Sequence, residues 1–118
     1  MKLRDGDAAQ ARALFLESLG LARELGDLRD VAFAVVGLAC ASVGEVEPAR
    51  VTRLLGAAEA ILKAVEIRLE PAEDAEFRRA VEAARLRVDP AAFAAAHAEG
   101  RAMALEQAIE YALTDQAD

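Results

Sequence analysis

The sequence predicts an all-α protein: a short right-handed α-solenoid in which about six helices form antiparallel hairpins. The first observation is composition, since 55% of the residues are hydrophobic, alanine is the commonest of them, and asparagine is absent. Alanine is the strongest helix former, and clusters of the β-branched residues that favour strands are few. The second observation is a repeat, because residues 6–12 (Gly-Asp-x-x-x-Ala-Arg) return 38 positions later as residues 44–50 (Gly-Glu-x-x-x-Ala-Arg). A period of this size is typical of stacked helical hairpins.

Three helices are expected in the first half of the chain. Overlapping stripes of leucine and alanine predict a helix over about 8–25, with Gly26 as the residue that ends it. The segment over about 28–43 is apolar nearly all round, which predicts a helix packed on both sides and capped by Asp27. A clean i, i+3, i+4, i+7 apolar stripe predicts a third helix over about 48–66.

Three more helices are expected in the second half. Prolines open the helices predicted over about 71–87 and 90–100, and the first of these carries acidic residues that complement the helix dipole. A one-sided pattern of leucine, alanine and isoleucine predicts the last helix over about 104–113. The links between the helices are short, which indicates antiparallel neighbours.

Length and charge limit the classes of protein to consider. The 118 residues leave room for one domain over 1–118, with a repeat-like core at 6–66 and C-terminal helices at 71–113. The net charge of −7 repels phosphate backbones and anionic lipids, so we expect neither nucleic acid nor a membrane as a partner. Cys40 is the only cysteine, which excludes an intrachain disulfide and fits the reducing cytoplasm, where we expect the protein to be.

The repeated segments resemble tetratricopeptide (TPR) repeats. Ala11 and Phe15 match the Ala-x3-Phe element of the second helix of that repeat. Val36, Gly37 and Cys40 stand where the repeat has Leu-Gly-x2-Tyr. The resemblance implies a TPR-like solenoid that binds partners on its concave side.

Further resemblance comes from residues 54–60, 91–103 and 105–109. They are similar to the C-terminal repeat region of large bacterial regulators with a STAND-class ATPase core, many of which carry a LuxR-type or SARP-type DNA-binding domain. The resemblance implies a non-catalytic protein–protein interaction or regulatory scaffold module, acting in signal transduction as the repeat arm of a transcriptional regulator. The alternative is a small-molecule-sensing helical domain of such a regulator. This chain itself has no P-loop motif and no basic recognition helix.

The residues that often carry chemistry stand alone in this sequence. His97 is the only histidine, and we expect a structural or surface role rather than a zinc ligand or general base. Cys40 lies in an apolar segment, which favours a buried small hydrophobe over a reactive thiol. The acids within 70–76 are expected to serve the helix dipole rather than bind calcium, and the arginines within 78–87 to pair with neighbouring acids. We therefore expect no catalytic residues, no metal and no cofactor.

Two surfaces are candidates for binding a protein partner. The first is an apolar end of the helix over 8–25, which is either covered by other parts of the chain or free to self-associate as a homodimer. It consists of Leu14, Phe15 and Leu19. The second is the concave side of the hairpins, represented on the next helix. It consists of Arg29, Asp30 and Phe33.

Overall fold

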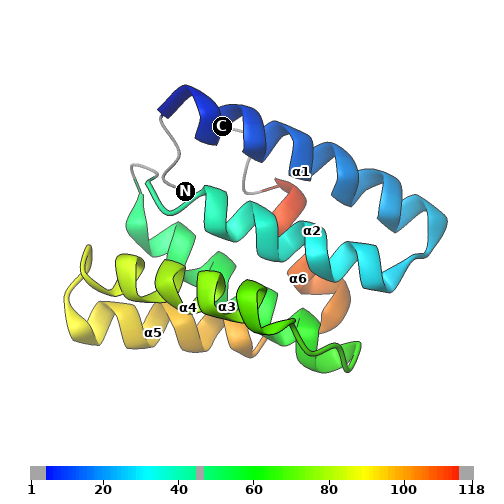
Figure 1. Ribbon diagram of the computed structural model, residues 1–118. Coiled ribbons are helices and arrows are strands. Elements are labelled where there is room, and N and C mark those ends of the chain that lie inside the picture. Colours follow the sequence, from blue (N-terminus) through cyan, green and yellow to red (C-terminus); the bar gives the residue numbers. More distant parts are fainter. Residues whose placement is uncertain (1–4, 45–46, 115–118) are drawn as a thin grey trace.

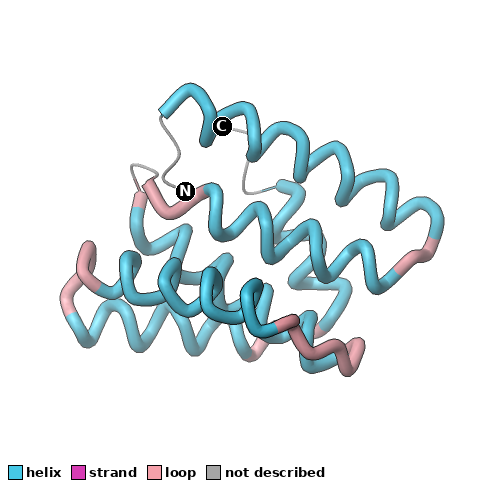
Figure 2. Tube along the Cα trace, viewed as in Figure 1, coloured by secondary structure: helices cyan, strands magenta, loops and turns pink. Residues whose placement is uncertain are grey.

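The computed structural model describes residues 5–44 and 47–114. In this part of the chain there are six α-helices and no β-strand, joined by short loops (Figure 2), so the all-α prediction is confirmed. The helices are α1 (Asp5–Leu25), α2 (Leu28–Ala41), α3 (Pro48–Ala64), α4 (Pro71–Arg85), α5 (Pro90–Arg101) and α6 (Leu105–Thr114).

The helices α2 to α5 begin where the local chemistry predicts, whereas α1 begins at Asp5, three residues before its predicted start. Pro48, Pro71 and Pro90 are the first residues of α3, α4 and α5, where the missing N–H of proline leaves no hydrogen bond unmade. The carboxylate of Asp27 accepts a hydrogen bond from the backbone N–H of Asp30 at 3.1 Å, which confirms Asp27 as the N-cap of α2.

The helices end slightly differently from the prediction. Gly26 terminates α1 with a φ of +73°, as expected, because glycine adopts the left-handed conformation without strain. α2 ends two residues early, since Ser42 is its C-cap and donates its hydroxyl to the Leu38 carbonyl at 2.7 Å. α3 also ends two residues early, and Glu66 takes a left-handed φ of 58° just beyond it. α4 stops at Arg85 rather than at 87.

α3 lies at the centre of the molecule and contacts α2, α4, α5 and α6. α1 packs mainly along α2 and reaches α6 with a few residues. Figure 1 shows α1 and α2 running antiparallel, with α3 and α5 on the far side of α2 from α1. The core therefore forms around α2 and α3. Its fully buried side chains include Leu19, Val31, Val35, Leu38, Leu54, Leu55, Ile61 and Ile109.

The pairing of α5 differs from what its short link to α4 predicts. α5 packs extensively on α3 and only slightly on α4, its neighbour in sequence. The reason is a close approach of two backbones at Gly56 of α3 and Gly100 of α5. A Cβ added at either glycine would lie closer than 3.0 Å to main-chain atoms of the other helix. The absence of side chains at these two positions thus lets α5 seat directly on α3.

Candidate interaction surfaces

The outer side of α1 carries a stripe of solvent-exposed leucines. Leu14, Leu21 and Leu25 are 59%, 57% and 81% exposed, and their spacing of seven and four residues places them on one face of the helix. We call these three residues the leucine face. Glu17 and Glu24 are exposed beside it on the same helix. The solvent-facing side of an ordinary surface helix is normally polar.

The structure separates the three residues predicted for self-association. Leu14 belongs to the leucine face, whereas Leu19 is fully buried in the core and presents nothing to a partner. Phe15 is half-buried, and its ring lies against Gly37 of α2 at a distance that leaves no room for a Cβ there. Leu21 and Leu25 were missing from the predicted surface, although their spacing from Leu14 already marks a stripe distinct from that of Leu19.

The three residues predicted on α2 lie near its start. Arg29 places its guanidinium 5.3 Å from the centre of the Phe33 ring, a cation–π arrangement one helical turn apart. The backbone of Asp30 is bound by the capping carboxylate of Asp27. Arg29 and Asp30 are exposed and Phe33 is half-buried, so these side chains form a small edge of charged and aromatic groups near the start of α2.

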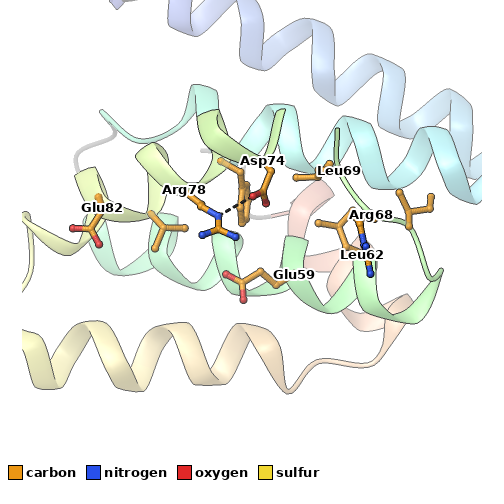
Figure 3. A pocket seen from close by; sticks show the side chains of 10 residues that line it. Glu59, Leu62, Arg68, Leu69, Asp74, Arg78 and Glu82 are labelled. Carbon is orange, nitrogen blue, oxygen red and sulfur yellow. Dashed lines mark hydrogen bonds and ion pairs between the residues drawn. The ribbon is translucent and has the colours of Figure 1, made fainter. Parts of the chain in front are cut away.

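A groove of about 680 Å³ lies between α3, the segment 65–70 and α4 (Figure 3). This volume falls in the range of pockets that hold small ligands, roughly 300–1,000 Å³. Half of the lining side chains are apolar and half are charged. They are Glu59, Leu62, Ile67, Arg68, Leu69, Asp74, Phe77, Arg78, Val81 and Glu82. None of these residues was singled out from the sequence as a binding residue, because they converge only when α4 folds back along α3.

Most of the charged groups on the α4 side of the groove are paired. Arg78 donates to the Asp74 carboxylate at 2.8 Å near the middle of the groove (Figure 3), and Arg85 donates to Glu82 at 3.2 Å. Arg68 differs from them. Within residues 5–44 and 47–114 it makes no hydrogen bond or ion pair, and Figure 3 shows it beside Leu62, away from Glu82.

The remaining acid of the groove, Glu59, connects α3 to α5. Its carboxylate lies 2.7 Å from Nε2 of His97 and 3.5 Å from Nε of Arg101. The His97 ring stacks on Phe93 with 5.3 Å between centroids. The histidine therefore links α5 to α3 through the Glu59 carboxylate, while its ring packs on Phe93 of its own helix.

Cys40 and the acidic residues within 70–76 each interact with neighbouring groups of the protein. Cys40 is half-buried rather than fully buried as the sequence predicted, and this partial burial raises the pKa of its thiol to about 11, with a further contribution from the negative charge of Glu76. In the acidic cluster, the carboxylate of Glu73 accepts a hydrogen bond from the backbone N–H of Glu70 at the start of α4. That interaction satisfies one of the donors left free at a helix N-terminus.

Among the residues that the structure describes, no group of three or more histidine, cysteine, aspartate or glutamate side chains is placed to hold a metal ion. No helix in the same part of the chain has the length and apolar character needed to cross a bilayer. Comparison with protein-family models, with curated proteins and with solved structures found no match.

Proposed function

We propose that the chain is a non-catalytic protein–protein interaction module whose leucine face docks against the same face of a second copy. The observation that carries this proposal is the exposure of Leu14, Leu21 and Leu25 along one stripe of α1. Burying such leucines stabilises an assembly by about 25 cal/mol for each Å² of apolar surface removed from water. Contiguous apolar patches on soluble proteins mark interaction sites more often than isolated leucines do.

The order of residues in the leucine face suits a symmetric antiparallel pair of α1 helices. With the twofold axis near Ser18, Leu14 lies opposite Leu21 of the partner subunit, and Leu21 lies opposite the partner's Leu14. Ser18 is small enough to allow a close approach at the axis. The nearby Glu17 and Glu24 carboxylates of both copies would repel one another, so the dimer should become tighter as salt is added.

Light scattering coupled to gel filtration tests this proposal. We expect the mass of a dimer to appear between about 10 µM and about 1 mM protein, at a lower concentration in high salt than in low salt. Leu21→Arg should keep the protein monomeric, because the arginine places a charge in the middle of the apolar contact. Leu86→Arg is the matched control, since Leu86 is an exposed leucine outside α1.

Two outcomes would contradict the proposed docking of a second copy. A protein that stays monomeric at about 1 mM in both salt conditions contradicts docking of a second copy. A dimer that Leu86→Arg breaks and Leu21→Arg preserves would place the contact on another face and would also contradict the proposal.

We propose in addition that the helices form a TPR-like right-handed solenoid that serves as a cytoplasmic regulatory arm. The duplicated segments at 6–12 and 44–50 support this, since one lies in the N-terminal part of α1 and the other runs into α3. α2 packs against both of these helices. The contact of Phe15 with Gly37 joins two of the residues on which the resemblance to TPR repeats rests. The similarity to regulator arms suggests that the partner is a signalling or transcriptional protein.

A second candidate function is the sensing of a small molecule, and the groove between α3 and α4 favours it. The groove has the volume and the mixed apolar and charged lining of a ligand site. A thermal-shift screen with metabolites is the test. We expect a ligand to raise the melting temperature, and a screen in which no compound does so would argue against this function.

A further inference from the structure

The groove between α3 and α4 has an apolar wall built from both helices and from the segment between them. Leu62, Ile67, Leu69 and Val81 are each half-buried, and Phe77 is buried beneath them. Half-buried apolar side chains around a hollow leave hydrocarbon surface in contact with water. A ligand with an aliphatic body removes that surface from water, which favours binding.

The backbone around the groove is held in place before any ligand binds. The N–H of Ile67 donates to the Leu62 carbonyl at 3.0 Å, and this bond closes the end of α3. The N–H of Glu70 donates to the Glu73 carboxylate at 3.1 Å, and Pro71 sets the first turn of α4. A wall that is already ordered loses little conformational entropy on binding.

The charged groups of the groove determine which charge a ligand should carry. Each carboxylate there has a cationic or histidine partner: Asp74 has Arg78, Glu82 has Arg85, and Glu59 has His97 and Arg101. Arg68 alone among the charged lining groups has no partner in the described residues. Because arginine binds carboxylates through two parallel N–H donors, the unpaired guanidinium is complementary to a carboxylate.

From these contacts we infer that the groove binds a small amphipathic carboxylate, with its aliphatic body against the apolar wall and its carboxylate on Arg68. This inference rests on the sensing function proposed above and names the class of ligand for that site. It is independent of the leucine face, which lies on α1 and shares no residue with the groove.

The test uses three eight-carbon probes that differ only in their head group: octanoate, octanol and octylammonium. Each is titrated into the isotopically labelled protein, and binding is read from backbone amide shifts. We expect octanoate to shift amides within 62–69 and 74–82 with a dissociation constant on the order of 1 mM, as its size allows. Octanol should bind about fivefold more weakly, and octylammonium more weakly still, because neither pairs with Arg68.

Two variants assign the contact to its residue. Arg68→Gln should weaken octanoate about fivefold and leave octanol unchanged, since only the charged contact is lost. Arg79→Gln is the matched control, because Arg79 is an exposed arginine of α4 outside the groove and its loss should change neither affinity. Circular dichroism confirms that both variants fold. Should Arg68→Gln fail to fold, the comparison of the three probes on the unaltered protein decides the question.

Three results would overturn the inference, and they differ in what else they affect. Octanol or octylammonium binding as tightly as octanoate would exclude carboxylate recognition and leave the sensing function standing. An Arg68→Gln variant that folds and binds octanoate normally would also exclude carboxylate recognition by Arg68 and leave the sensing function standing. Amide shifts confined to α1, or none for any probe at several millimolar, would remove both the ligand class and the groove as a sensing site.

Discussion

At the scale of single residues, Gly56 and Gly100 decide how α3 and α5 meet. Both are buried glycines inside helices, and the backbone of each helix fills the space that a side chain of the other would need. A glycine inside a helix costs about 0.5–1 kcal/mol relative to alanine, so the close packing has to outweigh that loss.

Gly100→Ala should lower the free energy of unfolding by about 2 kcal/mol, because overpacking exceeds the gain in helix propensity. The atoms in the way belong to the backbone and cannot rotate aside. Gly20→Ala is the matched control, since Gly20 lies inside α1 with no atom within 4 Å of an added Cβ. It should raise the free energy of unfolding by about 0.5–1 kcal/mol. Urea unfolding measures both, and equal effects in the two variants would contradict the packing argument.

Cys40 offers a second test at the same scale. Because burial and the negative charge of Glu76 disfavour the thiolate, the pKa of Cys40 is raised to about 11. At pH 8 the thiolate is then about a thousandth of the population, against about a quarter for an ordinary cysteine. Alkylation by iodoacetamide at pH 8 should be roughly two hundredfold slower in the folded protein than in urea, and should keep accelerating up to pH 10. Equal rates in the two states would contradict the burial of this thiol.

At the scale of elements, the start of a helix is determined by the local sequence more reliably than its end. Pro48, Pro71 and Pro90 begin helices because of their own covalent geometry, which no neighbour has to supply. At the end of α2 the Ser42 hydroxyl donates to the Leu38 carbonyl four residues back, which is a local bond, and only the burial of Ser42 depends on the tertiary structure. The predicted starts of α3, α4 and α5 were accurate, whereas the predicted ends of α2, α3 and α4 were two residues too long.

Asp27→Ala tests the capping of α2. It removes the acceptor for the Asp30 N–H, so the free energy of unfolding should fall by about 1 kcal/mol in urea. Glu24→Ala, at an exposed position of α1 in the preceding turn, should change it by less than about 0.5 kcal/mol. An equal loss in the two variants would show that the loss of a surface carboxylate, rather than the loss of the cap, destabilises the protein.

At the scale of the whole molecule, the position of α3 governs where the surfaces form. α3 is covered by α2, α4, α5 and α6, whereas α1 is supported mainly by α2. The principal extents of 38 × 31 × 31 Å show that the helices form a compact body. The leucine face is therefore a consequence of α1 lying at the edge, whereas the α3–α4 groove forms where α3, the segment 65–70 and α4 meet.

The candidate surfaces were only partly visible in the sequence. Leu14 and Leu19 lie on different stripes of α1, and the direction of the α2 contact decides that the stripe of Leu19 faces inward while Leu14 stays exposed. Arg68 sits between Ile67 and Leu69 in a segment with no motif, and its relation to Arg78 and Glu82 exists only after α4 has folded back.

The sequence by itself determined the all-helical class, the number of helices, the Asp27 and Gly26 caps, and the proline starts. These follow from backbone preferences and from side-chain periodicity over neighbouring residues, which act within one or two turns. Only the tertiary structure decided that α5 packs on α3, which leucines of α1 stay in water, and that Glu59 pairs with His97 and Arg101 of α5. Those outcomes depend on contacts between residues dozens of positions apart, such as Gly56 with Gly100, and local propensity carries no information about them.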